Sequence, residues 1–173
     1  LSFAELLSKV SEIGIDRVRF VTSHPWDFTD EMIKVIAEKE NIMPYIHLPL
    51  QSGSSRILKL MGRRYTKEEY IELYDNIRNT VPNCSITTDI IVGFPNETDK
   101  DFEETLEVVN HCKYDSAFTF IFSPRIGTPA AKMEDKVTLK EKEDRLHRLN
   151  ELVNKYSLEA NKQYLNKDVE VLI

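Results

Sequence analysis

Short apolar runs rich in β-branched residues alternate with capped helical segments along the chain, and this alternation constrains the fold more than any other feature. Four such runs occupy 18–22, 45–50, 86–93 and 117–122. They are nearly continuous in apolar character, as expected for strands covered on both faces. Their starts lie roughly 30 to 40 residues apart, which is the length of a strand plus a crossover helix. The pattern predicts an α/β fold of parallel strands joined by right-handed crossover helices.

Helix start signals stand between the apolar runs. An N-cap hydroxyl precedes an acidic residue by three positions at four places, which is the spacing of a capping box: Ser2 and Glu5, Thr66 and Glu69, Thr98 and Asp101, Thr138 and Glu141. Asp27 and Asp30 are a weaker start signal. The last helical region, about 139 to 165, is long and heavily charged.

Composition and charge exclude several classes of protein. The chain has 173 residues with 23 basic and 29 acidic side chains, a net charge of −6, which argues against wrapping nucleic acid by bulk charge. No apolar run is long enough to cross a membrane. Two cysteines, Cys84 and Cys112, cannot supply a three-thiolate metal site, and we expect a reducing, cytoplasmic compartment. The first residue is Leu1 and the apolar end at 169–173 looks like an interrupted strand, so we expect a piece of a longer protein.

Polar loops follow each of the apolar runs. Ligands of parallel α/β proteins bind at the carboxyl ends of the strands. The loops at 22–25, 50–54, 93–97 and 123–129 are rich in Gly, Pro, Ser and Thr. Turn chemistry alone explains any one such loop. All four together favour a binding site.

Three polar residues within or beside the runs have two interpretations each. Asp89 lies inside an apolar run, where a bare carboxylate is costly, so it is either ion-paired or faces a barrel lumen or polar ligand. His47 is either a hydrogen-bonded core histidine or a ligand contact. His24, at a strand end, is the better candidate for ligand contact. No histidine pair has metal-site spacing and no nucleophile–base triad is visible, so we assign neither metal ligands nor catalytic residues.

The segment 56–67 carries basic residues and no acid: Arg56, Lys59, Arg63, Arg64 and Lys67. Such a run is either a solvated helix end or a contact for a carboxylate or for RNA phosphates. Tyr65 lies within it and is available to stack or pack.

Four motifs together resemble the radical SAM methylthiotransferases. They are His-Leu-Pro-Leu-Gln-Ser-Gly-Ser at 47–54, Met-Gly-Arg-Arg-Tyr-Thr at 61–66, the segment 88–98 containing Gly-Phe-Pro-Asn-Glu, and the segment 122–130 containing Ser-Pro-Arg. The resemblance covers about residues 2 to 165. The segment 19–29 is most similar to the branch that adds a methylthio group to isopentenyladenosine beside the tRNA anticodon. Asn96 stands where the family usually has Gly, and Phe122 where Tyr is common.

The resemblance implies a fold and its boundaries. The family core is a partial (β/α)6 barrel, and the four runs correspond to its strands 3–6. Residues 1–137 would form the partial radical SAM barrel core, 138–166 its C-terminal helix, and 167–173 the start of a TRAM-like domain. The CxxxCxxC cluster motif of the family is not in this chain.

The resemblance also implies a site. S-adenosyl-L-methionine (SAM) is the expected cofactor, with [4Fe–4S] clusters in the full-length protein whose ligands are absent from this chain. Gln51 and Ser52 would lie near the SAM ribose and Arg63 near its carboxylate. The adenine would lie along the backbone of 91–94 and near Phe122. The cofactor-binding residues are then His47, Gln51, Ser52, Arg63, Asp89, Ile91, Gly93, Phe94 and Phe122, and the substrate-facing residues are Ser23, His24 and Arg125.

The implied partners are the anticodon arm of tRNA and an electron donor that reduces the cluster, with no membrane. We expect an active enzyme only as the full-length protein, with this chain inactive alone. Three alternatives remain: a non-catalytic RNA-binding module, another methylthiotransferase branch acting on threonylcarbamoyl-adenosine tRNA or a ribosomal protein, and a cluster-free lyase or aldolase. The last of these requires a strand-end lysine for a Schiff base, and none of the four strand ends has one.

Overall fold

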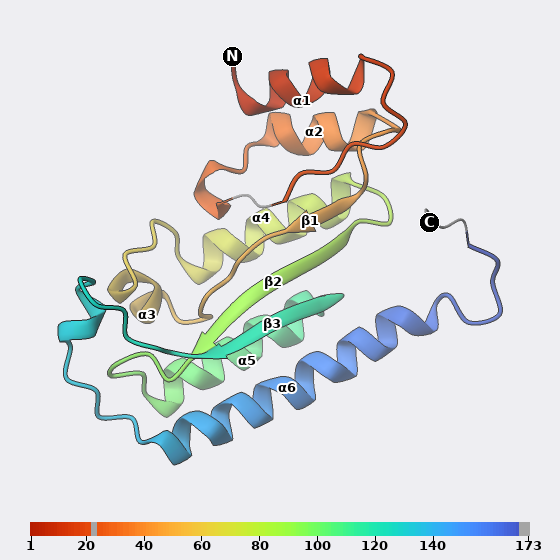
Figure 1. Cartoon of the computed structure of the whole chain (residues 1–173). Helices are drawn as coiled ribbons and strands as arrows, with labels where there is room; N and C mark the ends of the chain where they lie inside the picture. The colour runs from red at the N-terminus through yellow and green to blue at the C-terminus, as the bar shows by residue number, and fades with distance from the viewer. Residues whose placement is uncertain (22–23, 170–173) are drawn as a thin grey trace.

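The chain forms a parallel three-stranded sheet with helical crossovers, which confirms the predicted α/β class. The computed structural model describes residues 1–21 and 24–169. The strands are β1 (Tyr45–His47), β2 (Ser85–Val92) and β3 (Ser116–Ile121), in the order β1-β2-β3. The helices α3 (Ser55–Leu60) and α4 (Lys67–Thr80) connect β1 to β2, and α5 (Asp99–Cys112) connects β2 to β3 (Figure 1).

The first predicted strand, at 18–22, does not join this sheet. Among the described residues of that segment, one parallel bridge joins Val18 to Ile42, fixed by hydrogen bonds from Val18 N–H to the Asn41 carbonyl and from Met43 N–H to the Val18 carbonyl. Arg19 and Val21 are exposed, so the segment lacks the two-sided burial on which the prediction rested. The second run forms a shorter strand than predicted. Leu48 N–H still donates to the Thr87 carbonyl, but Leu50 N–H donates to the Thr88 hydroxyl instead of a carbonyl of β2.

All four predicted capping boxes are present. They begin α1 (Phe3–Ser11), α4, α5 and α6 (Leu139–Lys162), each with reciprocal bonds between the N-cap residue and the acid three positions on. Of the two weaker start signals, Asp30 begins α2 (Asp30–Glu38), which Thr29 caps, whereas Asp27 ends the 3₁₀ helix η1 (Pro25–Asp27). The sequence analysis missed α3, capped by Ser54, and η2 (Ala130–Lys132).

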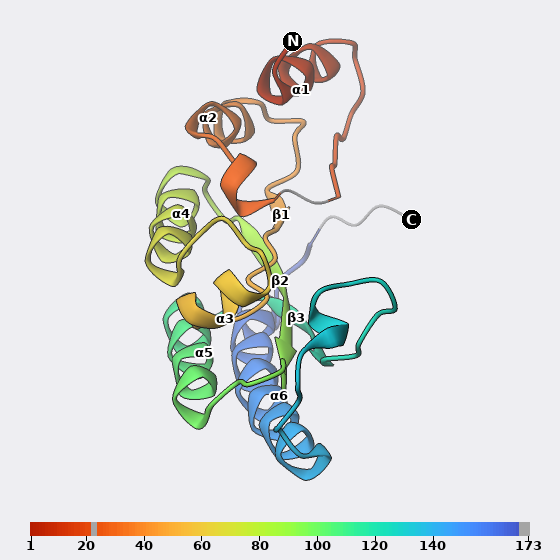
Figure 2. The same ribbon diagram turned by 90° about the vertical axis from the view of Figure 1, so that its left-hand side faces the viewer.

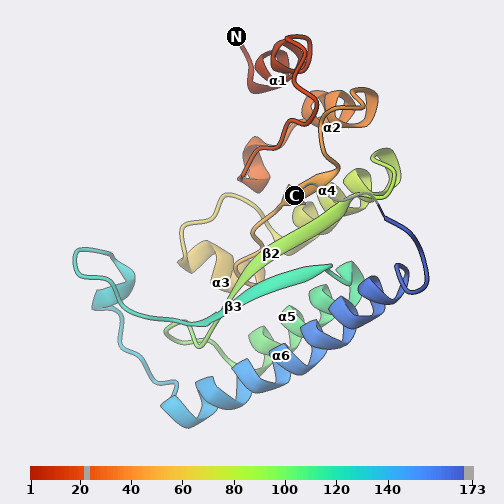
Figure 3. The ribbon, with the colours of Figure 1, turned by 45° about the vertical axis from the view of Figure 1, so that its right-hand side comes forward.

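The helices α4, α5 and α6 cover one face of the sheet and leave the other open (Figure 2). The core fills this covered side with fully buried side chains such as Ile46, Ile86, Ile90, Phe102 and Leu149. Figure 3 shows α6 running along β3 and beside α5, and its Leu149, Val153 and Tyr156 belong to the same core cluster. The C-terminal helix therefore packs as part of one core.

The side chains on the open face follow from strand alternation. Tyr45 and His47 of β1, and Thr87 and Asp89 of β2, are two residues apart and point to the same side. Phe118 of β3 stands opposite Asp89 in the ladder and is largely exposed. This open face is the counterpart of the lumen expected for a partial barrel.

The C-terminal end of the chain follows α6. Residues 167–169 have no regular secondary structure, and 170–173 of the predicted TRAM-like strand lie outside the described residues. In the part of the chain that the structure describes, no helix is both long and apolar enough to span a bilayer.

Candidate functional site

A chain of hydrogen bonds crosses the open face of the sheet. The Tyr45 hydroxyl lies 3.2 Å from Thr87 Oγ1, which lies 2.9 Å from His47 Nδ1. His47 Nε2 in turn lies 3.3 Å from Asp89 Oδ2. The Asp89 carboxylate is therefore partnered, and both ring nitrogens of His47 have polar neighbours. A hollow of about 270 Å³ opens over these groups, with Arg19 and Phe118 in its wall.

The carboxyl end of β1 turns sharply at Gln51. Gln51 has a left-handed backbone with φ of 68°, and it bridges to β2 by donating its N–H to the Asp89 carbonyl at 2.8 Å and accepting from Ile91 N–H at 2.9 Å. Ser52 is fully buried, and its hydroxyl accepts from Ser54 N–H. Backbone and side chain thus fix this turn beside the end of β2.

The end of β2 is equally fixed. Gly93 has φ of +70°, and a Cβ there would lie 2.4 Å from Cγ of Lys142 on α6. Its N–H donates to Glu97 Oε2 at 2.8 Å. Because the amide hydrogens of Ile91 and Gly93 already have partners, an adenine at this edge would meet backbone carbonyl oxygens and the Ile91 side chain instead. Phe94 and Phe122 pack edge to face with their ring centroids 4.9 Å apart, and they provide an aromatic corner there.

A buried ion pair that the sequence analysis missed holds this loop to α6. Arg145 Nη1 lies 2.9 Å from Glu97 Oε2, and the two side chains are 5% and 1% exposed. Arg145 Nη2 also binds Asp99 at 2.8 Å. Burial raises the pKa of Glu97, against the opposing effect of the Gly93 amide and the Arg145 guanidinium. Glu97 lies in the motif at 88–98, but its partner Arg145 is 48 positions further along the chain, in the charged helix α6.

Asp101 is a second centre of polar contacts. It accepts from Ser54 Oγ at 2.6 Å, from Arg56 Nε at 3.1 Å and from the N–H of Thr98 at 2.8 Å. Burial alone would raise the pKa of Asp101, but the hydrogen bonds from Arg56, Ser54 and Thr98 outweigh it and hold the pKa well below its usual range. The acid of the α5 capping box, Asp101, therefore also anchors the loop after β1.

Two of the five basic residues in the predicted segment are paired with acids of α5. Arg56 pairs with Asp101, and Lys67 lies 3.9 Å from Glu104. Tyr65 packs inside, with its hydroxyl donating to the carbonyls of Pro49 and Leu50. The segment is thus mainly a support for the strand ends.

Two residues predicted for different ligands lie together. Arg63 Nη1 lies 3.0 Å from His24 Nε2, and since arginine only donates, Nε2 accepts and His24 is neutral with its proton on Nδ1. Burial, reinforced by Arg63, lowers the pKa of His24. Neither His24 Nδ1 nor Arg63 Nε has a hydrogen-bond partner among the described residues, and both atoms are buried. A ligand acceptor would satisfy them.

The two other substrate-facing predictions do not gather at this point. Ser23 lies outside the described residues. Arg125 is exposed in the loop after β3, where its carbonyl accepts from Thr128. The structure therefore brings together the residues around Gln51 and β2, and separately His24 with Arg63.

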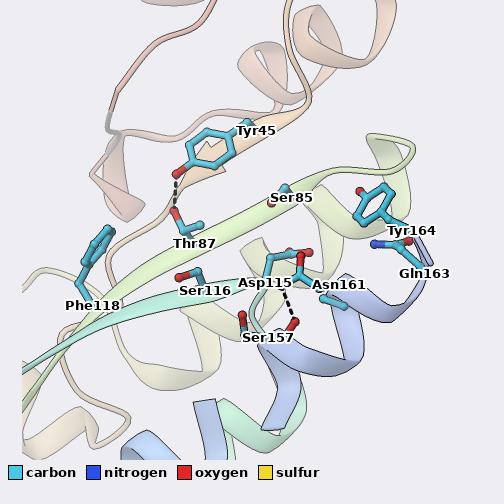
Figure 4. A pocket seen from close by; sticks show the side chains of 11 residues that line it. Tyr45, Ser85, Thr87, Asp115, Ser116, Phe118, Ser157, Asn161, Gln163 and Tyr164 are labelled. Carbon is cyan, nitrogen blue, oxygen red and sulfur yellow. Dashed lines mark hydrogen bonds between the residues drawn. The ribbon is translucent and has the colours of Figure 1, made fainter. Parts of the chain in front are cut away.

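Another hollow lies at the opposite end of the sheet. It measures about 360 Å³ and is lined by Tyr45, Ser85 and Ser116, which begin the three strands, and by Asn161 and Tyr164 near the end of α6 (Figure 4). None of the predicted site residues lines it. This hollow thus lies away from the carboxyl ends of the strands, where the polar contacts converge.

No group of three His, Cys, Asp or Glu residues in the described ranges is arranged to hold a metal ion. Cys84 and Cys112 are buried free thiols, and burial raises the pKa of each to about 12.

Comparisons with known proteins agree on one family. The family model described as the Radical SAM superfamily matches residues 1–109. A tRNA-2-methylthio-N(6)-dimethylallyladenosine synthase of Bacillus cytotoxicus is 54% identical over 98% of this chain and 33% of its own length. The protein of the same name from Bacillus subtilis is 55% identical with the same coverage. The chain thus spans about one third of the length of the curated relatives it matches.

A solved structure shares the fold. The coproporphyrinogen III oxidase HemN of Escherichia coli, a radical SAM enzyme, superposes with a TM-score of 0.66 over 81% of this chain and 32% of its own, at 17% sequence identity. That similarity supports the partial-barrel architecture and agrees with the family model, whose match extends over well over half of the chain. The chain belongs to the radical SAM superfamily.

Proposed function

We propose that this chain is the SAM- and substrate-binding portion of a methylthiotransferase that modifies isopentenyladenosine, also called dimethylallyladenosine, in tRNA. The observation that carries this proposal is the 54–55% identity to synthases of that name over nearly the whole chain, loops included. The matched region covers the strand ends as well as the core, so the comparison bears on the site and on the fold together.

The residues at the strand ends fit SAM. Gln51 and Ser52 present a rigid turn for the ribose, and Phe94 with Phe122 forms an aromatic corner for the adenine. The buried, unpartnered Nε of Arg63 is a donor suited to the methionine carboxylate. When bound to the clusters of the longer protein, SAM supplies the radical chemistry, and this chain's residues bind and orient it.

The open face of the sheet is the proposed substrate side. His47 and Asp89 would line the lumen below SAM, and His24 and Arg125, with Ser23, would face the nucleoside. The partners are then the anticodon arm of tRNA and an electron donor that reduces the cluster, in the cytoplasm. We retain the proposed division into a core at 1–137, its C-terminal helix at 138–166 and a TRAM-like domain beginning at 167.

The alternative of a non-catalytic RNA-binding module has less support. That alternative rested on the basic segment, and two of its charges are paired with acids of α5. The choice among methylthiotransferase branches is one for experiment.

A chimera tests the proposal. This chain replaces the matching third of the Bacillus subtilis synthase, and the chimera is expressed in cells that lack their own methylthiotransferases. We expect mass spectrometry of tRNA nucleosides to show methylthiolated isopentenyladenosine. The matched control is the same chimera with Arg63→Ala, which we expect to be impaired.

Two outcomes would contradict the proposal. Methylthiolation of threonylcarbamoyl-adenosine instead would place the chain in another branch. A chimera that folds and assembles its clusters but modifies no nucleoside would remove the methylthiotransferase assignment.

A further inference from the structure

A hollow beside the strand ends has a mainly aromatic wall. It measures about 340 Å³, lies between η1 and α4, and is lined chiefly by Trp26, Phe28, Arg64, Tyr65, Glu69 and Tyr70. We call it the Trp26 hollow. Its volume falls within the range of about 300–1,000 Å³ typical of ligand sites. It belongs neither to the lumen face nor to the SAM-binding turn described above.

Trp26 is held rigidly although 36% of its surface is exposed. Its ring stacks on His24 with centroids 3.3 Å apart and an interplanar angle of 26°. His24 is in turn fixed by its bond to Arg63. A flat aromatic surface that is both exposed and braced from behind is a platform on which another planar ring can stack at little entropic cost.

The charge of the hollow comes from Arg64. Its guanidinium lies 5.6 Å from the centre of the Trp26 ring, and its side chain makes no ion pair with any residue that the structure describes. Arg56 and Lys67 in the same segment are paired with acids, so Arg64 stays available for an anion. The nearby Glu69 carboxylate is engaged by the N–H of Thr66 in the capping box of α4, and it disfavours a phosphate at that wall.

The hollow is joined to the proposed active site through Tyr65. The Tyr65 hydroxyl donates to the Leu50 carbonyl at 3.0 Å, directly before Gln51. A polymer whose one unit reaches the strand ends would therefore place a neighbouring unit near Trp26. Aromatic rings beside a free arginine are the combination by which proteins bind unpaired nucleotides.

We propose that the Trp26 hollow binds an unpaired RNA nucleotide that flanks the modified one, with its base stacked on Trp26 and its phosphate at Arg64. This inference rests on the proposed tRNA substrate and assigns a separate contact to it. Arg63 and Arg64 then have different ligands, since Arg63 faces SAM and Arg64 faces RNA.

The single tryptophan of the chain provides the test. The 173-residue chain is titrated with an RNA hairpin whose loop consists of unpaired adenosines, and with a fully paired RNA duplex of the same length. We expect the hairpin to quench Trp26 fluorescence and the duplex to leave it unchanged. Anisotropy of the labelled hairpin then gives the affinity of variants that lack the tryptophan.

Three variants sharpen the test. Trp26→Ala should weaken hairpin binding by about 5- to 100-fold, the effect of losing one stacked base, while Trp26→Phe keeps most of it. Arg64→Ala should lower the slope of log affinity against log salt by about 0.7, the contribution of one phosphate contact to a single strand. Lys162→Ala, an exposed lysine at the far end of α6, is the charge-matched control and should change neither.

The results separate the possible outcomes. Equal quenching by hairpin and duplex, or unchanged affinity in both Trp26→Ala and Arg64→Ala, would overturn the proposal. If Trp26→Ala misfolds, the salt dependence of Arg64→Ala decides, and an unchanged slope there would overturn the proposal. The Bacillus subtilis chimera keeps the two proposals apart. If the chimera methylthiolates tRNA and its Trp26→Ala variant has an unchanged KM for tRNA, the Trp26 hollow is not an RNA contact while the proposed function stands.

Discussion

The pair formed by Glu97 and Arg145 is the most consequential contact between single residues in this fold. Both side chains are buried, and together they tie the loop after β2 to α6. Arg145→Met would leave the Glu97 carboxylate buried without its partner, which typically costs about 3–5 kcal/mol. We expect a loss of this size in the free energy of unfolding measured by urea denaturation.

The chain contains a matched control for that change. Arg148 of α6 forms an ion pair with Glu103 of α5, but the two side chains are 42% and 53% exposed. Arg148→Met should therefore cost at most about 1 kcal/mol, because exposed pairs are screened by water. Equal losses of unfolding free energy in the two variants would show that the buried Glu97–Arg145 pair stabilises the fold no more than the exposed pair does.

Arg63 and Arg64 are adjacent but have different environments. Arg63 is partly buried with an unpartnered Nε, whereas Arg64 is exposed over Trp26. In the chimera with both clusters, Arg63→Ala should weaken SAM binding by about 1.5–3 kcal/mol, the value of a hydrogen bond to a charged group. Arg64→Ala should leave SAM binding nearly unchanged in the same titration. Similar SAM dissociation constants for the two variants would contradict the assignment of the SAM carboxylate to Arg63.

Asp101 gives the fold a dependence on pH. Its folded-state pKa lies well below the ordinary value, because hydrogen bonds to the carboxylate outweigh burial. The unfolded chain therefore takes up this proton first, and stability from Asp101 is present above about pH 4 and lost as the pH falls below it. Asp101→Asn should lower the unfolding free energy by about 1.5–3 kcal/mol at pH 7. The difference from the unchanged protein should shrink in urea titrations at lower pH, and a constant difference would contradict this assignment.

Local residue patterns predicted some of these features and not others. The capping boxes need only residues three positions apart, and all four are present. The side-chain bonds of Asp101 to Ser54 and Arg56, and of Glu97 to Arg145, span 45 to 48 positions, so no local pattern joins these residues. The bonds of His47 to Thr87 and Asp89 depend likewise on the register of β1 against β2.

Among the elements, the loop after β1 lies unusually close to α5. A Cβ on Gly53 would stand 2.4 Å from Cα of Thr105 and 2.6 Å from the Glu104 carbonyl. Because these are helix backbone atoms that cannot rotate away, Gly53→Ala should cost about 3 kcal/mol or more by overpacking. Thermal denaturation followed by circular dichroism measures this loss.

Gly62 serves as the control at the level of the element. Its φ of +74° strains a side chain, but no atom lies within 4 Å of the position of its Cβ. Gly62→Ala should therefore cost only the conformational strain of about 1–3 kcal/mol. A larger loss of stability in Gly62→Ala than in Gly53→Ala would mean that the backbone of α5 shifts easily to make room for a Cβ at position 53.

The helices and strands also divide into those that a local sequence pattern predicts and those that depend on distant contacts. The runs at 86–93 and 117–122 became β2 and β3, because they are buried by helices on the covered side of the sheet. The run at 18–22 has similar composition, but among its described residues only Val18 makes a bridge. The short helix α3 left one sequence signal, the Ser54 cap before buried Ile57 and Leu58, but without an acid at the third position.

At the scale of the whole molecule, the open face of the sheet leaves aromatic surface in water. Phe118 and Phe120 are 56% and 51% exposed on β3, and they stand opposite Asp89 and Ile91 of β2. Exposed apolar patches of this kind promote association, and the edge strands of an open sheet add unpaired backbone N–H and C=O groups. We therefore expect the isolated chain to self-associate as its concentration rises.

Substitution on the open face tests this expectation. Phe118→Ser combined with Phe120→Ser removes the aromatic surface without touching the covered core, so the apparent mass in sedimentation velocity should become independent of concentration. The matched control is Leu158→Ser on α6, where an apolar side chain that is 58% exposed lies on another surface. A wild-type chain that sediments as a monomer at every concentration would show that this face is compatible with water by itself. Association that persists in the double variant would instead locate it at the strand edges, where backbone groups rather than side chains make the contact.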